Sequence, residues 1–281
     1  MALIKRCPVI TIMGHVDHGK TTLLDYIRQS HIQASEVGGM TQHIGAYQIM
    51  FKNQPITFID TPGHAAFNKM RQRGAQVTDL VVLVVAANDG VKPQTIESIR
   101  HIKDAKVPVM VAINKIDLPD VHPDNVKSQL AEHGILVQEY GGDVEVVEIS
   151  AKTGQGVEKL LETIVLLTDL MELKADPQAP LEAVVIESTK DKNKGAVARV
   201  IVKQGTLKVR QELVVGEIKG KARCLINEKG ELSQEVLPGT PIEIVGLAEV
   251  PEVGETIREM GANYIGEPPN NISHTGELEK T

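Results

Sequence analysis

Eight consecutive residues near the start of the chain have the types and spacing of a phosphate-binding loop. They fit the pattern G-x-x-x-x-G-K-[ST] at every required position and are Gly14, His15, Val16, Asp17, His18, Gly19, Lys20 and Thr21. Backbone N–H groups of such a loop, together with those of Thr22 at the start of the next helix, converge on a phosphate chain. Lys20 adds positive charge for the β- and γ-phosphates, and the Thr21 hydroxyl is placed to bind Mg²⁺. The expected chemistry is binding of a nucleoside triphosphate with its magnesium ion.

A second group of residues points to the γ-phosphate. The stretch Asp60-Thr61-Pro62-Gly63-His64 follows an apolar segment and has the D-x-x-G spacing of phosphate-loop GTPases. In those enzymes the aspartate reaches Mg²⁺ through water, and the glycine N–H contacts the γ-phosphate. Alone, the stretch would be a good turn sequence, and His64 an ordinary turn histidine. Next to a complete phosphate loop, it predicts that Asp60, Gly63 and His64 act at the γ-phosphate.

A third group of residues points to the base. Asn114, Lys115 and Asp117 form an N-K-x-D pattern at the carboxyl end of an apolar segment, the edge where open α/β sheets bind ligands. Asp117 can accept hydrogen bonds from guanine N1–H and the exocyclic amine, while Asn114 can donate to the base and brace the loop. Adenine lacks the N1–H, and unpaired buried polar groups cost roughly 1–3 kcal/mol each, so the pattern favours GTP over ATP. A polar helix entry would be the alternative if the pattern stood alone.

A weaker signal for the base is the triplet Ser150, Ala151 and Lys152. Its backbone could contact guanine O6, and the Lys152 side chain could lie near the ring. Three residues carry little information by themselves. The prediction therefore depends on their position directly after an expected strand.

These motifs can form one site only if parallel strands bring their carboxyl ends to the same edge of a sheet. Apolar runs predict buried strands over 9–12, 80–86, 107–113 and 144–149, and a hairpin of strands 47–51 and 56–59 around 52–55. Apolar spacing predicts helices over 21–28, 65–74, 95–102, 123–133 and 157–173. The expected fold is an α/β phosphate-loop GTPase domain with a mostly parallel sheet flanked by helices.

The pattern changes after a linker punctuated by prolines over 174–180. Short β-branched runs separated by glycines predict a small antiparallel β-barrel with strands over 183–187, 196–202, 212–215, 222–226, 242–245 and 255–257. We therefore expect a GTPase domain over 1–175, a β-barrel over 176–258 and a disordered tail over 259–281.

Composition narrows the class of protein further. The net charge of −7 argues against a free-standing nucleic-acid binder, although 188–223 holds ten basic and three acidic residues. That segment could contact RNA phosphates or be the solvated face of a barrel. No apolar run approaches the ~18 residues of a membrane span, and no secretory signal begins the chain. We expect a cytoplasmic protein without membrane contact, and nothing indicates a dimer, so a monomer is expected.

Cysteine and histidine spacing does not indicate a structural metal. Cys7 and Cys224 fit no metal or redox spacing and are expected to be free thiols. His15, His18 and His43 have no supporting carboxylate or cysteine spacing for zinc, so His15 and His18 are expected to be ordinary loop residues.

Longer strings carry a resemblance to a known family. The phosphate loop with D-x-P-G-H resembles translational GTPases. The strings at 9–13, at 38–47 (Gly-Gly-Met-Thr-Gln-His-Ile-Gly-Ala-Tyr), and at 65–67 through 73–75 closely resemble bacterial and organellar translation initiation factor two. This resemblance covers residues 5–258. It implies GTP and GDP as substrate and product, Mg²⁺ as metal, and the ribosome as partner, with the barrel docking on the small subunit.

The resemblance also implies residue roles. Thr41 would bind Mg²⁺ and the γ-phosphate together with Thr21 and Asp60, and His64 would position the attacking water. Val16 and Met40 would form an apolar gate near that water. No arginine is placed to stabilise the transition state in cis, so hydrolysis is expected to be slow until ribosomes stimulate it.

The family's role is GTP-dependent placement of initiator tRNA and joining of ribosomal subunits. Its C-terminal half, which grips the initiator aminoacyl end, has no counterpart here, so initiator tRNA binding by this chain is not expected. Two alternatives stay open. One is another translational GTPase, of the elongation-factor or selenocysteine-specific type, and the other is a nucleotide-gated ribosome-binding module with little hydrolysis.

Overall fold

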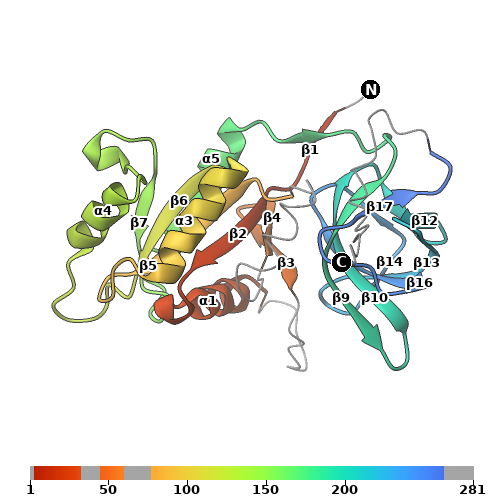
Figure 1. The fold of residues 1–281 in the computed structure, drawn as a ribbon, viewed down its shortest axis with the longest axis horizontal. Helices are drawn as coiled ribbons and strands as arrows, with labels where there is room; N and C mark the ends of the chain where they lie inside the picture. The colour runs from red at the N-terminus through yellow and green to blue at the C-terminus, as the bar shows by residue number, and fades with distance from the viewer. Residues whose placement is uncertain (1–2, 33–44, 60–76, 263–281) are drawn as a thin grey trace, which may run out of the picture.

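The computed structural model describes residues 3–32, 45–59 and 77–262, which form a helix-flanked sheet and a separate β-barrel (Figure 1). The first unit is built on a six-stranded sheet with the order β3-β4-β2-β5-β6-β7. Its strands are β2 (Val9–Gly14), β3 (Ala46–Phe51), β4 (Gln54–Ile59), β5 (Leu80–Ala86), β6 (Val109–Asn114) and β7 (Val146–Glu148). Only the β3–β4 pair is antiparallel among these strands, which confirms the mostly parallel sheet expected from the sequence.

Helices cover both faces of this sheet. They are α1 (Lys20–Ile32), α3 (Pro93–Ala105), α4 (Pro123–Glu132) and α5 (Val157–Leu170). Helices α1 and α5 pack against one face, and α3 and α4 against the other. Strand β5 has seven buried residues because its alternate side chains enter the two separate cores, Val82 and Val84 one core and Leu83 and Val85 the other. Within the described residues, no helix is long and apolar enough to cross a membrane.

Several element boundaries differ from the sequence prediction. The hairpin turn contains only Lys52 and Asn53, both with positive φ (46° and 64°), while Gln54 and Pro55 already belong to β4. Helix α5 ends at Leu170 rather than at 173. In the expected linker, β8 (Lys174–Ala175) pairs antiparallel with β1 (Ile4–Lys5). A two-residue strand has no periodicity to detect, so this pairing was not predictable from the pattern. The expected helix over 65–74 lies outside the described residues.

The second unit is a closed antiparallel barrel. Its sheet runs β12-β17-β9-β10-β16-β13-β14 and closes through an additional β12–β13 pairing. The strands are β9 (Glu182–Asp191), β10 (Gly195–Gln204), β12 (Glu212–Val215), β13 (Ile218–Ile226), β14 (Leu232–Ser233), β16 (Pro241–Leu247) and β17 (Thr256–Glu259), with a side pair of β11 (Leu207–Lys208) and β15 (Glu235–Val236). The expected barrel is thus confirmed. Strand β17 includes Glu259, the residue at which the tail was expected to begin, and residues 263–281 lie outside the described part.

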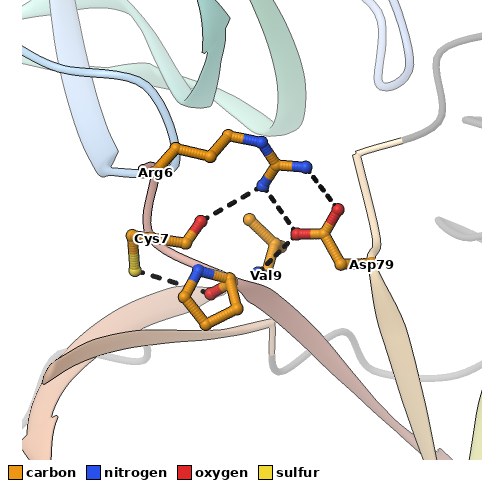
Figure 2. Close-up of polar contacts among 5 residues, drawn as sticks. Arg6, Cys7, Val9 and Asp79 are labelled. Carbon is orange, nitrogen blue, oxygen red and sulfur yellow. Dashed lines mark hydrogen bonds and ion pairs between the residues drawn. The ribbon is translucent and has the colours of Figure 1, made fainter. Parts of the chain in front are cut away.

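An arginine–aspartate pair joins the start of β2 to the start of β5 (Figure 2). Two guanidinium nitrogens of Arg6 donate to the two carboxylate oxygens of Asp79, at 2.6 and 2.5 Å. The same carboxylate accepts the Val9 N–H at 2.8 Å, and Arg6 also donates to the Cys7 carbonyl at 3.1 Å. This bidentate pair is largely buried, so it holds β2, which leads into the phosphate loop, next to β5.

The barrel packs against the β3–β4 end of the sheet (Figure 1). Apolar side chains from both units form one buried cluster of Val9, Ala46, Ile59, Val77, Val184, Ile186 and Ile201. A hydrogen bond crosses the same contact, in which the Thr57 hydroxyl donates to the Gly239 carbonyl at 2.7 Å. The two units are therefore in direct buried contact.

Candidate functional site

The predicted phosphate loop connects β2 to α1 at the carboxyl edge of the sheet. Strand β2 ends at Gly14, a short 3₁₀ turn covers Val16–His18, and α1 begins at Lys20. Gly14 has a φ of +131°, and a Cβ there would lie 2.2 Å from the Val84 carbonyl oxygen. Gly19 has a φ of +83°, and its Cβ would lie 2.5 Å from an Asn114 nitrogen. Both glycines are therefore required by backbone conformation and by close packing.

Lys20 bends back over the loop that precedes it. Its Nζ donates to the Gly14 carbonyl at 2.8 Å and to the His15 carbonyl at 2.6 Å. The positive charge thus lies at the loop and at the first turn of α1, where helix N–H groups also point. Thr21 and Thr22 are exposed in that first turn, so both are accessible to a ligand seated on the loop.

Asn114 connects the phosphate loop to the loop after β7. Its Nδ2 donates to the His18 carbonyl at 2.8 Å, and its Oδ1 accepts the Ala151 N–H at 2.9 Å. The side chain is only 2% exposed, so both bonds form away from water. The predicted bracing role is therefore present, and it directly joins two motifs that lie far apart in sequence.

The other residues predicted to recognise the base differ in their exposure and contacts. Lys115 adopts a left-handed backbone conformation with φ of 67°, and its Nζ lies 3.8 Å from an Asp89 carboxylate oxygen. Asp117 is exposed just beyond β6. Ser150 is buried and its hydroxyl accepts the Thr153 N–H at 3.2 Å, which shapes the turn. Ala151 is buried and bonded to Asn114, whereas Lys152 is exposed.

The exposed part of the phosphate loop is held by a residue that the motifs did not identify. Val16 is 69% exposed, and its N–H donates to the Gln94 Oε1 at 3.2 Å. Gln94 lies in the first turn of α3, far along the chain, and belongs to no pattern used above. Asp17, beside Val16, donates its N–H to the His15 Nδ1 at 3.4 Å. Gln94 could not be found from the loop pattern because the contact depends on how α3 packs.

His15 and His18, treated alike in the sequence prediction, differ strongly in environment. Their rings are 5.1 Å apart, yet His15 is partly exposed and His18 is completely buried. Burial lowers the pKa of His18 from 6.5 to about 4. Within the described residues, no group of three His, Cys, Asp or Glu side chains is placed to hold a metal. The burial of His18 had no signal in the sequence, where it is one polar residue in a loop.

Several predicted site residues cannot be placed. Thr41, Met40, Asp60, Gly63 and His64 lie outside the described residues. Strand β4 ends at the residue before Asp60 and pairs in parallel with β2, which carries the phosphate loop. The D-x-x-G prediction assumes that the strand before Asp60 lies beside the strand before the phosphate loop, and β4 and β2 are neighbours in the sheet.

Known proteins resemble this chain in both sequence and fold. Residues 5–169 match the family of the elongation factor Tu GTP binding domain, and residues 180–260 match elongation factor G domain 2. Translation initiation factor IF-2 from a Nitratiruptor species is 58% identical over 255 residues, which are 91% of this chain and 30% of that protein. IF-2 from Moorella thermoacetica is 54% identical over 253 residues, 90% of this chain and 28% of that protein. This chain therefore spans less than a third of the length of these relatives.

Two solved structures have the same arrangement. GDP-bound aIF5B from Aeropyrum pernix matches with a TM-score of 0.78 and 27% identity, over 92% of this chain and 55% of that one. Translation elongation factor SelB from Methanococcus maripaludis, in its apo form, matches with a TM-score of 0.73 and 26% identity, over 92% and 56%. The resemblance to initiation factor two inferred from the motifs is confirmed by these comparisons. Because the first match covers more than half of the 281 residues, the chain belongs to the family of the elongation factor Tu GTP-binding domain.

Proposed function

We propose that this chain is a ribosome-stimulated GTPase of translation initiation, which switches between GTP-bound and GDP-bound states in the cytoplasm. The observation that carries the proposal is the Asn114 brace, because it makes the phosphate loop and the guanine-selecting loop one site. The initiation role is supported by relatives named translation initiation factor IF-2 at 54% and 58% identity. We assign the GTPase to residues 1–175 and the barrel to 176–258.

The proposed reaction is in-line attack of water on the γ-phosphorus. A bond forms to the water oxygen, the bond to the bridging oxygen of the β-phosphate breaks, and GDP and phosphate are released. Lys20, already held at the loop, neutralises charge on the β- and γ-phosphates. His64 orients the water, and Val16 with Met40 forms an apolar gate beside it. The protein contributes positioning and charge rather than covalent chemistry.

The residues proposed for the metal suit magnesium. Thr21 presents a hydroxyl at the mouth of the loop beside Lys20, and Thr41 and Asp60 offer further oxygen donors. Oxygen ligands are the type that Mg²⁺ takes in phosphate-loop proteins, where it neutralises charge between the β- and γ-phosphates.

Hydrolysis measured with and without ribosomes tests the enzymatic part. We expect slow turnover by the protein alone and a rise of roughly 10³–10⁵-fold with ribosomes, because the sequence predicts no arginine that would stabilise the transition state in cis. His64→Ala should abolish most of this stimulation while GTP affinity stays unchanged, and His122→Ala, at an exposed histidine, should behave as wild type. Equal rates with and without ribosomes would contradict the proposal. GTP-dependent ribosome binding without hydrolysis would instead support the nucleotide-gated module.

The likeness to SelB keeps an elongation-factor role as the second candidate. Light scattering of separated ribosomal subunits distinguishes the two roles. An initiation factor should accelerate subunit joining in the presence of GTP, whereas an elongation-type GTPase should act only on assembled ribosomes.

The basic segment 188–223 divides into two environments on the barrel. Lys194 pairs with Glu243 at 2.7 Å, and Arg199 pairs with Glu187 at 2.7 Å. Three other basic residues alternate on the outer face of β13 and are exposed: Lys219, Lys221 and Arg223. No ion pair of these three occurs within the described part of the chain. We propose that this face of β13 contacts ribosomal RNA phosphates.

Salt dependence of ribosome binding tests the proposed RNA contact. Replacing the three β13 side chains with glutamine should reduce the slope of log affinity against log salt by roughly two to three, because that many phosphate contacts are lost. The same replacement of the paired Lys194 and Arg199 serves as control and should leave the slope nearly unchanged. Unaltered binding in the triple variant would make the β13 face a solvated surface.

A further inference from the structure

The imidazole of His18 lies beneath the phosphate loop, against β5. It is 0% exposed, although Asp17 beside it is exposed. Its Nδ1 is 3.3 Å from the Val84 carbonyl oxygen. A carbonyl oxygen can only accept a hydrogen bond, so Nδ1 carries the proton and donates. The side chain therefore attaches the loop to the middle strand of the sheet.

The backbone of the same residue is attached to the neighbouring strand. The His18 carbonyl accepts the hydrogen bond from Asn114, at the end of β6. Gly14, at the other end of the loop, also rests on Val84, because a Cβ there would lie 2.2 Å from the same carbonyl oxygen. Gly14 and His18 thus both contact the Val84 carbonyl, Gly14 by close packing and His18 through its ring nitrogen.

The environment of the second ring nitrogen shows that, in the described part of the chain, only one of the two nitrogens of His18 forms a hydrogen bond. Nε2 is buried without a hydrogen-bond partner in the described residues. Burying a nitrogen without a hydrogen-bond partner costs free energy. If His18 only filled space, an apolar side chain of similar size would do so at a lower cost. The contribution specific to histidine is therefore the Nδ1–H donor.

We propose that His18 is a positioning residue of the nucleotide site, holding the loop's backbone N–H groups in the arrangement that binds phosphates. It does so through its bonds to Val84 and Asn114 and touches no substrate itself. This inference rests on the guanine-nucleotide binding proposed above and deepens it by naming a residue that sets the affinity.

Three replacements of His18 test this role in the full chain. His18→Asn keeps a donor at the position of Nδ1, since the asparagine Nδ2 reaches the same point. His18→Gln carries its donor farther out, near the position of Nε2, and His18→Leu fills the space without a donor. His101→Leu is the matched control, because His101 is also buried, at 7% exposure, but lies in α3 away from the loop.

The measurement is the affinity and dissociation rate of a fluorescent GDP analogue, with thermal unfolding followed in parallel. We expect His18→Leu and His18→Gln to bind roughly 5- to 100-fold more weakly, the range for a lost buried hydrogen bond. His18→Asn should stay within about threefold of wild type. His101→Leu should bind GDP as wild type does.

Equal GDP affinity in the Asn and Gln variants would overturn the inference, even if the Leu variant failed to fold. Unchanged affinity in a folded Leu variant would also overturn it. Wild-type protein that bound no guanine nucleotide would overturn the proposed function as well, and that result is distinct because it appears before any substitution.

Discussion

At the residue scale, base selection and loop bracing belong to different side chains of one motif. Asn114 uses its amide oxygen and nitrogen to join the phosphate loop to the loop after β7. Asp117 is exposed and forms none of these bonds, so its carboxylate is available to the base. We therefore propose that Asp117 selects guanine, while Asn114 sets the shape of the site.

Asp117→Asn should change which base is preferred. The carboxylate accepts hydrogen bonds from the guanine N1–H and from its 2-amino group. An amide has one acceptor and one donor group, which match the N1–H and the 2-carbonyl of xanthine. We expect GTP affinity to fall roughly 10²- to 10³-fold and xanthosine triphosphate affinity to rise. Competition against a fluorescent nucleotide measures both. Asp120→Asn, at an exposed residue nearby, is the control and should change neither.

The low pKa of His18 predicts a pH-dependent stability. Its pKa is about 4 in the folded chain and about 6.5 when unfolded, so the unfolded state binds more protons between these values. Stability should therefore fall as the pH decreases from 6.5 toward 4, by about 3 kcal/mol at most. The titratable groups that act electrostatically on the ring are His15, Asp89 and Lys115.

Urea unfolding between pH 4 and 7 measures this effect. The His18→Asn variant has no titrating group at this position and should lose that part of the pH dependence. Identical profiles for the variant and the wild type would show that other groups cause the decline.

At the element scale, a buried lysine positions the edge strand that leads to the base loop. Lys127 of α4 lies within 2.8 Å of a Glu139 oxygen and within 3.2 Å of oxygens of Asp124 and Glu148. Its side chain is 6% exposed, while its partners are largely exposed. The cluster therefore attaches α4 to β7, directly before the loop that contains Ser150 and Ala151.

Replacing this lysine should destabilise the β7 edge. Lys127→Met keeps the length of the side chain but leaves three carboxylates without their shared cation. We expect the free energy of unfolding to fall by about 1–2 kcal/mol. This loss is smaller than for a fully buried ion pair, because the carboxylates are exposed. Denaturant unfolding measures this loss, and Lys159→Met, at an exposed position of α5, is the control. Equal stability of the two variants would show that the cluster contributes little.

At the scale of the whole molecule, the barrel and the sheet share one buried contact. Ile59 and Val77 belong to it, and these residues flank the segment that contains Asp60 and His64. The buried contact with the barrel thus includes a residue on each side of the proposed γ-phosphate segment. A close backbone approach supports the contact, because a Cβ on Gly239 would lie 2.4 Å from the Cys7 carbonyl oxygen.

Gly239→Ala should loosen this contact. Gly230→Ala is a matched control, because both glycines have positive φ (+87° and +79°) but a Cβ on Gly230 meets nothing within 4 Å. Both variants carry the same backbone strain, so a further loss of stability in Gly239→Ala reports the contact between the units. We expect that loss to be about 1–3 kcal/mol, with faster proteolysis at 174–180. Equal behaviour of the two variants would contradict a tightly packed contact.

Much of the fold followed from local patterns. The fully apolar run at 80–86 predicted a doubly buried strand, and the structure places it between two cores. The glycine-separated runs after 180 predicted the barrel. The β1–β8 pair could not be predicted, because a strand of two residues shows no alternation of apolar and polar side chains. The predicted hairpin turn is longer than the observed one, because Pro55 is a common turn residue but lies on β4.

The residue types of the site and the order of its motifs are encoded in the chain. The spacing within Gly14–Thr21 and within Asn114–Asp117 is local, and local spacing is encoded directly in the chain. Three contacts emerge only in the folded chain: Asn114 bonds to both loops, Gln94 binds Val16, and His18 is buried against Val84. Such contacts depend on which strands lie side by side and how closely they pack, because residues distant in the chain meet only after the sheet has formed.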